Sequence, residues 1–411
     1  MRLLQLTHRL PWPPIDGGKK GTLGFVDGYR RHAGIDHHGL LSMCPREEAD
    51  WAADWKPEGT DLKVDLMDAR NSAVRVLANT AFSSQPFNMA KYQRPSFEAM
   101  VREAINARRP DVVHFDSLHT AWYAARVRQE APDALRVLRC HNAEHVILAR
   151  LAESETNPVK KALIALQAKR LHDYEAAALD AFDLILAITE ADAARFRAMN
   201  PRIDPRMIIV PAGADVPDVL PPSPAAVGGP IRLVHIAAMD WLPNQAALKW
   251  FLEGVLPGLD EAGLDYRLDV VGKNMPDDFK RYESARVRVH GFVQDLAPIT
   301  SAAHVAVVPL QVGGGMRVKI LDYWAMGIPV IATQVGAEGL SDGVEATVAL
   351  ADTQPDFVRA ILQLARSPES REALRASAFR KVRANYGWAG IVDGLVSRYG
   401  DMLSRRAGTR A

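Results

Sequence analysis

The amino-acid sequence predicts an α/β protein built from two doubly wound, Rossmann-like domains. The chain has 411 residues, which suits two domains of ordinary size, each with its own core. Short apolar runs alternate with helical segments throughout, a pattern typical of parallel sheets covered on both faces. With 48% hydrophobic and 24% charged residues, the composition is that of a globular protein.

The apolar runs predict strands in both halves of the chain. In the first half they cover residues 2–6, 39–44, 111–116, 135–140, 183–189 and 207–213. In the second half they cover residues 231–237, 266–272, 286–293, 304–310 and 329–333. Strands that alternate with helices in this way indicate two open parallel sheets.

The boundary between the predicted domains is visible in the composition. Residues 216–230 contain five prolines and two glycines, which is typical of a linker. We predict a first domain over residues 1–216, a linker over 217–230 and a second domain over 231–384. A C-terminal amphipathic helix, residues 385–411, is expected to cross back to the first domain. Open α/β sheets bind ligands at the carboxyl ends of their strands, so we expect the site in a cleft between the domains.

Charge and cysteine content exclude several functional classes. Fifty basic residues against forty-nine acidic ones leave a formal net charge of +1, which disfavours nucleic acid as a partner. Two distant cysteines form neither a disulfide framework nor a zinc motif. The N-terminal segment is too polar for a secretory signal, and no apolar stretch approaches the roughly 20 residues of a membrane span. We therefore expect a cytoplasmic protein that meets any membrane substrate from the surface.

The segment VGGGMRVKILDYWAMGIPVIAT, residues 312–333, is the most informative part of the chain. The pattern predicts a glycine loop followed by a helix over 316–326, with Gly327 as the stop signal and Pro329 after it. Glycines allow a ligand to approach the backbone, and the first turn of a helix attracts phosphate. The segment is neither a Walker P-loop nor a G-x-G-x-x-G motif.

Charged side chains directly behind these glycines favour an anionic ligand. We expect Arg317 in the first helical turn, where it is a bidentate phosphate donor. Lys319 and Asp322 are three residues apart and therefore share one helix face. The alternative is a loop whose glycines only turn the chain, followed by a surface ion pair that contributes a few tenths of a kcal/mol.

A second pair of glycines, Gly17 and Gly18, follows the first predicted strand and precedes a helix expected from about residue 21. Such a loop lies at the carboxyl edge of a doubly wound sheet.

Polar residues also follow two neighbouring strands of the first domain: His114, Asp116 and His119, then His141, Asn142 and Glu144. A lone histidine near a strand end is more often a structural residue, but two clusters at adjacent strand ends favour substrate binding by at least one of them. We find no metal-binding pattern such as D-x-D.

The segment 157–176 carries Lys160, Lys161, Lys169 and Arg170 among apolar residues. Two interpretations remain open: a solvated helix, or a helix that lies on an anionic membrane.

Over nearly its full length the chain resembles the GT-B glycosyltransferases of the retaining family 4, and it looks closest to the branch in exopolysaccharide and exosortase-associated gene clusters. The resemblance rests on the glycines at 17–18 and on residues 110–116, 139–144, 182–192, 210–215, 237–251, 268–274, 289–296 and 312–333. Family members normally carry a glutamate at the position of Gly314 and another at Asp322, and many have an arginine where this chain has Met239.

This resemblance implies a donor site in the second domain. Asp322 would hold the ribose, and Arg317 and Lys319 would neutralise the diphosphate. The implied donor-binding residues are Gly17, Gly18, Gly272, Lys273, Gly313, Gly314, Gly315 and Asp322. The first domain would be the acceptor side, where His119 or Asp116 positions the transferred sugar and His141, Asn142 and Glu144 face the sugar or the acceptor.

The resemblance also implies transfer with retention of configuration, with no metal and no cofactor. Arg317, Lys319, His119 and Asp116 would be the catalytic residues, and domain closure would exclude water. The expected partners are a UDP- or GDP-sugar and a glycan or lipid-linked acceptor, with peripheral contact to the inner face of the cell membrane. The alternatives are a non-hydrolysing nucleotide-sugar epimerase and a silent binding module with the same fold.

Overall fold

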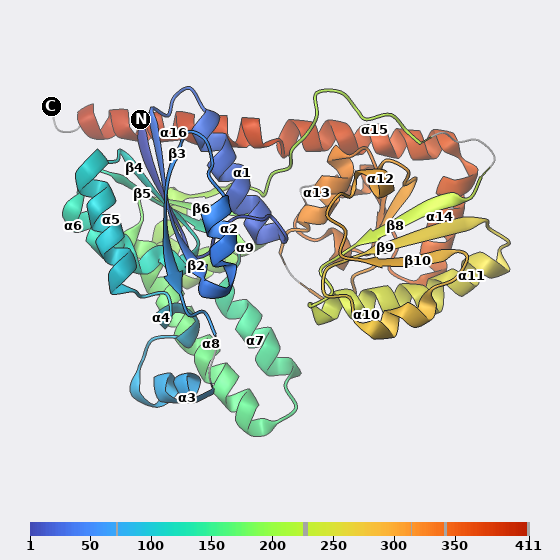
Figure 1. Ribbon diagram of the computed structural model, residues 1–411, viewed down its shortest axis with the longest axis horizontal. Helices are drawn as coiled ribbons and strands as arrows, with labels where there is room; N and C mark the ends of the chain where they lie inside the picture. The colour runs from blue at the N-terminus through green and yellow to red at the C-terminus, as the bar shows by residue number, and fades with distance from the viewer. Residues whose placement is uncertain (71–72, 225–228, 314, 341–342, 409–411) are drawn as a thin grey trace. The chain divides into compact units, whose positions relative to one another are not determined.

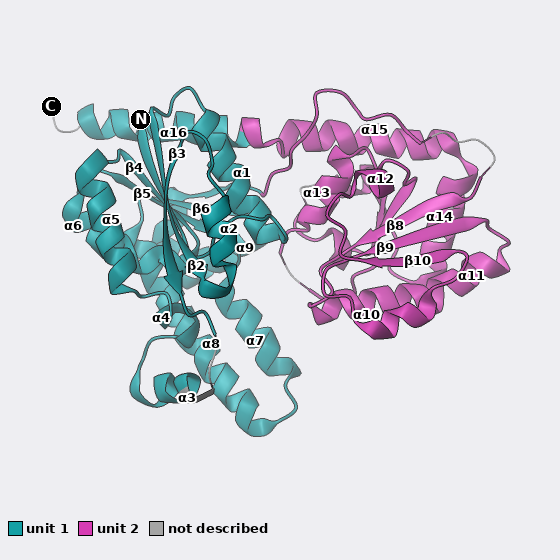
Figure 2. Cartoon of the chain, in the orientation of Figure 1, with its two compact units in different colours: residues 1–211, 391–411 teal, residues 212–390 magenta. Residues whose placement is uncertain are grey.

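The computed structural model describes residues 1–70, 73–224, 229–313, 315–340 and 343–408. The chain forms two compact units, which Figure 2 shows in different colours. The first unit contains Met1–Pro211 and Ile391–Ala411, and the second contains Ala212–Gly390. Each unit is built around its own parallel sheet.

The described residues of the first unit include a seven-stranded sheet in the order β3-β2-β1-β4-β5-β6-β7. All neighbouring strands are parallel, and the chain reverses its direction of winding between β1 and β4. The strands are β1 Arg2–Thr7, β2 His37–Pro45, β3 Thr60–Met67, β4 Val112–Asp116, β5 Leu135–Cys140, β6 Leu184–Ala187 and β7 Met207–Ile209.

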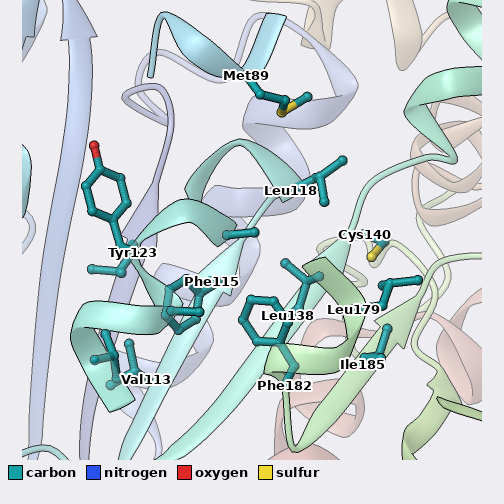
Figure 3. Packing of buried hydrophobic residues seen from close by; sticks show 14 of the residues in the cluster. Met89, Val113, Phe115, Leu118, Tyr123, Leu138, Cys140, Leu179, Phe182 and Ile185 are labelled. Atoms are coloured by element: carbon teal, nitrogen blue, oxygen red, sulfur yellow. The ribbon is translucent and has the colours of Figure 1, made fainter. Parts of the chain in front are cut away.

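Helices cover this sheet and extend beyond it (Figure 1). They are α1 Gly17–Arg31, α2 Ala49–Asp54, α3 Ala73–Phe82, α4 Phe87–Ala90, α5 Pro95–Arg108, α6 Ala124–Glu130, α7 Glu144–Ser154, α8 Pro158–Ala178 and α9 Glu190–Met199. The 3₁₀ segment η2, Leu118–Tyr123, follows β4. Figure 3 shows the core beneath these helices, where Phe115 and Phe182 meet edge to face with ring centroids 5.0 Å apart.

The C-terminal helix α16, Trp388–Gly408, belongs to the first unit from Ile391 onward. It packs on α1 so closely that a Cβ atom at Gly28 would lie 2.4 Å from Val392. The hydroxyls of Tyr29 and Tyr399 also lie 3.1 Å apart in the buried contact. The expected return of a terminal helix to the N-terminal domain is therefore confirmed.

The second unit contains a six-stranded parallel sheet, within the described residues, in the order β10-β9-β8-β11-β12-β13. The strands are β8 Ile231–Ile236, β9 Tyr266–Val271, β10 Val287–Gly291, β11 Val305–Val308, β12 Val330–Ala332 and β13 Val348–Leu350. The helices are α10 Leu242–Trp250, α11 Leu256–Glu261, α12 Ala297–Thr300, α13 Val318–Ala325, α14 Gln354–Arg366 and α15 Pro368–Asn385. The winding reverses between β8 and β11, so this order repeats that of the first unit.

Each apolar run predicted as a strand contains one, but the sequence pattern missed β3 and β13. Both are edge strands. β3 carries Asp61, Lys63 and Asp65 among apolar residues, because one side of an edge strand has no neighbour and polar side chains are tolerated there. β13 has only three residues, too few for a periodic pattern.

Among the described residues, none of the helices combines the length and apolar character needed to cross a bilayer.

Candidate functional site

The carboxyl edge of the second sheet is organised around α13. The Tyr323 hydroxyl accepts a hydrogen bond of 2.9 Å from the backbone N–H of Ile236, which ties α13 to the end of β8. The loops after β8 and β9 are joined by a backbone hydrogen bond of 3.0 Å from the Met239 N–H to the Lys273 carbonyl. The N-terminus of α13 is therefore fixed beside the loops that follow β8 and β9.

Lys319 lies in the first turn of α13 and is half-buried. Its Nζ is 3.4 Å from Asn244 Oδ1, and the Asn244 amide in turn donates to the Ala238 carbonyl at 2.7 Å. Burial, with a smaller contribution from nearby Arg317, lowers the pKa of Lys319 to about 8. An ammonium group under this penalty gains most from an anionic ligand.

Arg317 is 7% exposed and precedes α13 as its N-cap residue. The expected helix over 316–326 therefore begins two residues later than predicted, at Val318, and Arg317 is not in its first turn. The Arg317 Nε donates to the Val335 carbonyl at 3.3 Å, and its Nη2 lies 3.8 Å from Glu338 Oε2. The guanidinium is thus held in place by the loop after β12.

The glycines before α13 make room for this arginine. A Cβ atom at Gly313 would lie 2.5 Å from Arg317 Nη2 and 3.0 Å from the ring of Trp241. Gly315 has a φ of 78°, a backbone conformation that favours glycine. Gly314 lies outside the described residues.

The remaining predicted residues of this domain lie at the same edge. Asp322 follows Lys319 by almost one turn on α13 and is half-buried. Gly272 directly follows β9, and a Cβ there would lie 2.1 Å from the Ala237 carbonyl. The Lys273 Nζ is 3.6 Å from Asp240 Oδ2. Close packing of the two loops therefore explains Gly272 without a ligand.

At the carboxyl edge of the first sheet, Asp116 is the centre of a buried network. It is the last residue of β4 and has no exposed surface. Its carboxylate accepts hydrogen bonds from Gln5 Nε2 at 2.9 Å, Arg139 Nη1 at 2.9 Å and His141 Nε2 at 2.8 Å. Burial alone would raise the pKa of Asp116, but Arg139 and His141 hold it well below its ordinary value. We interpret Asp116 as the residue that orients these two side chains.

His119 lies in η2 and stacks on His8, with ring centroids 4.4 Å apart and planes within 15°. Its Nδ1 is 2.7 Å from the Ser117 hydroxyl, and Tyr92 meets the ring edge-on at 4.9 Å. Burial, followed by the effect of His141, lowers the pKa of His119 to about 3, and burial also lowers the pKa of His8. Both imidazoles are therefore neutral near pH 7.

Gly17 and Gly18 form the start of α1, four residues earlier than the helix expected from about residue 21. Asp16 is the N-cap and accepts from the Lys19 N–H at 2.9 Å. It also pairs with Arg9 at 2.7 Å, and a Cβ atom at Gly18 would lie 2.2 Å from the Arg9 Nη2. The absence of a side chain at Gly18 therefore accommodates Arg9.

Asn142 and Glu144 lie at the start of α7. Burial, followed by the charge of Glu175, raises the pKa of Glu144 to about 7, although a hydrogen bond from Asn142 opposes this. Glu175 on α8 is fully buried and accepts from the Glu144 N–H at 3.1 Å. Its other oxygen lies 2.6 Å from His145 Nδ1, so one carboxylate ties the beginning of α7 to α8.

Sequence reasoning missed several residues at these two edges. His8 and Arg9 directly follow β1, so the same strand-end rule that selected Asp116 could have identified them. Tyr92 and Glu338 gave no such signal, because the first lies in a loop between α4 and α5 and the second follows a short 3₁₀ turn. Only the fold brings them close to His119 and Arg317.

The two edges differ in what they can do chemically. The edge of the second unit presents two cations, Arg317 and Lys319, at a helix N-terminus, an arrangement that stabilises phosphate oxygens. The edge of the first unit presents neutral imidazoles, which exchange hydrogen bonds with uncharged hydroxyls. Among the described residues, no group of three or more His, Cys, Asp or Glu side chains is arranged to hold a metal ion.

Comparisons with known proteins assign both units. A model described as "Glycosyltransferase Family 4" matches residues 58–217, and one described as "Glycosyl transferases group 1" matches residues 230–367. A search of curated proteins found no match.

Solved structures share the fold across almost the whole chain. Sucrose-phosphate synthase from Thermosynechococcus elongatus is 15% identical with a TM-score of 0.69, covering 98% of this chain and 100% of its own. HepE from Anabaena, in complex with UDP, is 12% identical with a TM-score of 0.66 and the same coverage, and it was also solved with UDP-glucose. The lipopolysaccharide outer core galactosyltransferase WaaB is 12% identical with a TM-score of 0.59, again covering 98% and 100%. With glycosyltransferase models on both halves and two parallel sheets of matching order, the protein is a glycosyltransferase with the GT-B fold.

Proposed function

We propose that this glycosyltransferase moves a sugar from a nucleotide-sugar donor to a glycan or lipid-linked acceptor, with retention of configuration and without a metal. The observation that carries the proposal is the pair of cations at the start of α13, within the segment matched by the group 1 model. Lys319 is half-buried and has a lowered pKa, so an anion that binds there is favoured over water.

The donor is a UDP- or GDP-sugar. UDP is favoured by analogy with the Anabaena protein, which was solved with UDP and with UDP-glucose. In this assignment Arg317 and Lys319 contact the diphosphate and Asp322 accepts hydrogen bonds from the ribose hydroxyls. Gly313 and Gly315 keep the backbone before α13 free of side chains, so that a phosphate can approach it as Arg317 does, and the loop that begins at Gly272 places Lys273 on the nucleotide side.

The chemical step is departure of the nucleoside diphosphate from C1 of the sugar. Negative charge grows on the leaving phosphate oxygen as the C1–O bond breaks, and Arg317 and Lys319 stabilise that charge. Each well-aimed donor lowers the barrier by roughly 2–4 kcal/mol. In a front-face mechanism the departing oxygen accepts the proton of the acceptor hydroxyl, so no carboxylate pair is needed. The two cations take the role that a divalent metal has in other transferases.

The first unit supplies the residues for the sugar and the acceptor. His119 is neutral and half-buried, which suits a hydrogen bond to a sugar hydroxyl. Asp116 acts through Arg139 and His141, because it has no exposed surface of its own. Asn142 and Glu144 are assigned to the acceptor. A lipid-linked acceptor, as in the exopolysaccharide branch, would bring the protein to the inner face of the cell membrane.

The test is an assay of nucleotide release with and without acceptor. We expect release of UDP or GDP to depend on a glycan or lipid-linked acceptor, to persist in a metal chelator, and to give a product with the donor's anomeric configuration. Acceptor-independent conversion of the donor would instead indicate an epimerase. Nucleotide binding without any turnover across acceptors would indicate a silent module.

A further inference from the structure

Six large apolar side chains are exposed on three helices of the first unit. Their exposed fractions range from 40% to 91%: Leu77 59%, Phe82 91%, Ile147 51%, Leu151 51%, Val159 77% and Leu166 40%. They lie on α3, α7 and α8, which project from the same end of this unit (Figure 1). We call these six side chains, with Lys160 and Lys161, the α3/α7/α8 surface.

The helices that carry this surface are fixed to one another. Gln167 on α8 is buried and donates to the Thr80 hydroxyl on α3 at 3.0 Å, and Arg170 donates to the Thr80 carbonyl at 2.9 Å. Glu175 on α8 also holds the first turn of α7, because its carboxylate contacts the Glu144 N–H and the His145 ring. The exposed apolar groups are therefore presented on a supported surface.

Spacing along the helices gathers the apolar groups on common faces. Ile147 and Leu151 are four residues apart on α7, and Val159 and Leu166 are seven apart on α8. Exposed apolar side chains gathered in this way mark an interaction site more often than scattered single ones do. Within the described residues of the unit these six side chains keep 40% to 91% of their surface exposed, so the surface is available to a partner.

The charge of the same segment identifies the partner. Lys160 and Lys161 lie in the first turn of α8, next to Val159, and both are exposed. Neither ammonium group has an ion-pair partner among the described residues. Over α7 and α8 together, residues 144–178, five lysines and arginines balance five acidic residues. Because Lys169 pairs with Asp173 at 2.7 Å, the cations that this surface offers to a partner are Lys160 and Lys161 beside Val159. Apolar groups bordered by lysines match a bilayer with anionic headgroups, where the apolar groups enter the acyl boundary and the lysines stay at the phosphates.

We propose that the α3/α7/α8 surface docks the protein on the anionic face of a phospholipid bilayer. This surface would be where the glycosyltransferase touches the membrane. The binding to lipid itself does not depend on the proposed function, but its purpose does, since docking would bring the enzyme to a lipid-linked acceptor. On this proposal Lys160 and Lys161 of the basic segment 157–176 lie at the membrane, whereas Lys169 pairs with Asp173 and Arg170 donates to the Thr80 carbonyl.

The first experiment measures co-sedimentation of the full chain with two kinds of vesicle. We expect binding to vesicles of equal parts phosphatidylcholine and phosphatidylglycerol, weaker binding as salt is added, and little binding to pure phosphatidylcholine. Equal binding to both vesicles, or binding to neither, would overturn the proposal.

Two double variants test the surface itself. Phe82→Ser/Val159→Ser removes apolar groups that are already solvent-exposed and should lower vesicle binding about tenfold or more. Lys160→Glu/Lys161→Glu should lower it roughly 30-fold and remove most of the salt dependence. The matched control is Phe292→Ser/Val219→Ser, which removes a phenylalanine and a valine that are 65% and 76% exposed in the second unit. Equal losses in the control and in Phe82→Ser/Val159→Ser would overturn the assignment.

Two further readouts separate this proposal from its alternatives. Thermal stabilisation by UDP should be the same in Phe82→Ser/Val159→Ser and in Lys160→Glu/Lys161→Glu as in the parent protein, because these four residues lie in the first unit, away from α13. If UDP, GDP and their sugars stabilise none of the proteins, the proposed function fails while the vesicle result still stands. If the free protein instead forms a concentration-dependent dimer that Phe82→Ser/Val159→Ser abolishes, the surface binds a second copy and the membrane proposal is wrong.

Discussion

The carboxyl edges of the two sheets have the same topology but opposite chemistry. In the first unit the Asp116 carboxylate is neutralised internally by Gln5, Arg139 and His141, and the stacked imidazoles of His8 and His119 are uncharged. In the second unit the hydrogen-bond partner of the Lys319 ammonium among the described residues is the Asn244 amide oxygen at 3.4 Å, and burial lowers the pKa of Lys319, so its charge is maintained at a cost. The same strand order thus carries a neutral edge, built around a saturated carboxylate and uncharged imidazoles, and a cationic edge.

This difference shows that the strand order determines where a site lies, whereas the side chains at the strand ends and in the loops determine which ligand it suits. The neutral edge suits recognition of hydroxyl groups, and the cationic edge suits a diphosphate. If this division holds, substitutions at the first edge should mainly change stability, and substitutions at the second edge should mainly change nucleotide binding and the rate of transfer.

The largest effect is expected from Asp116→Ala, which would leave Arg139 buried without its carboxylate. We expect a loss of about 3–5 kcal/mol in the free energy of unfolding, measured by denaturant titration. The control is Asp240→Ala at the second edge, where the pair with Lys273 is 3.6 Å long and half exposed, and where we expect at most about 1 kcal/mol. Similar losses in the two variants would show that the first edge is not an internally neutralised network.

Arg317→Ala should reduce the rate of sugar transfer by about 100-fold or more, because it removes a donor from the leaving group. The measurement is steady-state release of nucleotide with acceptor present. Arg286→Ala removes an exposed arginine elsewhere in the second unit and should leave the rate unchanged. Near-normal turnover of Arg317→Ala would remove this residue from the mechanism.

Asp322→Ala should weaken nucleotide binding by roughly tenfold, because a charge-assisted hydrogen bond to the ribose is lost. Titration calorimetry with UDP and with 2′,3′-dideoxy-UDP separates this contact from other effects. The variant and the parent should bind the dideoxy nucleotide equally. A loss of the same size for both nucleotides would contradict the ribose assignment.

The smallest effect is a pH dependence of nucleotide affinity. Burial lowers the pKa of Lys319 to about 8 in the free protein, so its charge is present below that pH and is lost as the pH rises through it. Affinity for UDP should therefore fall above about pH 8, by at most about tenfold per pH unit. Lys319→Arg keeps its charge throughout and should flatten the profile. A profile that is already flat in the parent protein would contradict a cationic edge built on Lys319.

The folding stability should change in the opposite sense over the same range. Above about pH 8 the unfolded lysine still holds its proton while the folded one has released it, so the unfolded state binds more protons. Stability from this group therefore rises from about pH 8 to the ordinary lysine pKa near 10.5 and is constant below pH 8.

The sequence was sufficient to predict the fold. Continuous apolar runs identify buried strands directly, whereas β3 and β13 are edge strands that lack this pattern. Arg317 and Lys319 were predicted to bind the diphosphate because they lie within a few residues of a glycine run, and that role stays a prediction. Gly314 lies outside the described residues, so its predicted role stays a prediction.

The first edge was harder to predict because its contacts join distant parts of the chain. Asp116, Arg139 and Gln5 come from three strands, and their saturation of one another is visible only in the folded unit. Gly18 was predicted to admit a phosphate, yet it is the Arg9 guanidinium that lies against it. A glycine pair after a strand indicates close approach, but it does not say which group approaches.

The central claim is that the cations at the start of α13 bind the diphosphate of a nucleotide sugar. The most direct measurement is a thermal-shift comparison of UDP-, GDP- and ADP-sugars with uridine, in the parent protein and in Arg317→Ala/Lys319→Ala. At 100 times its dissociation constant, the cognate donor should stabilise the parent by about 2.7 kcal/mol, and the double variant much less at the same concentration. Uridine, which has no phosphate, should stabilise both proteins weakly and equally. Equal stabilisation of parent and variant by every nucleotide sugar would contradict the account.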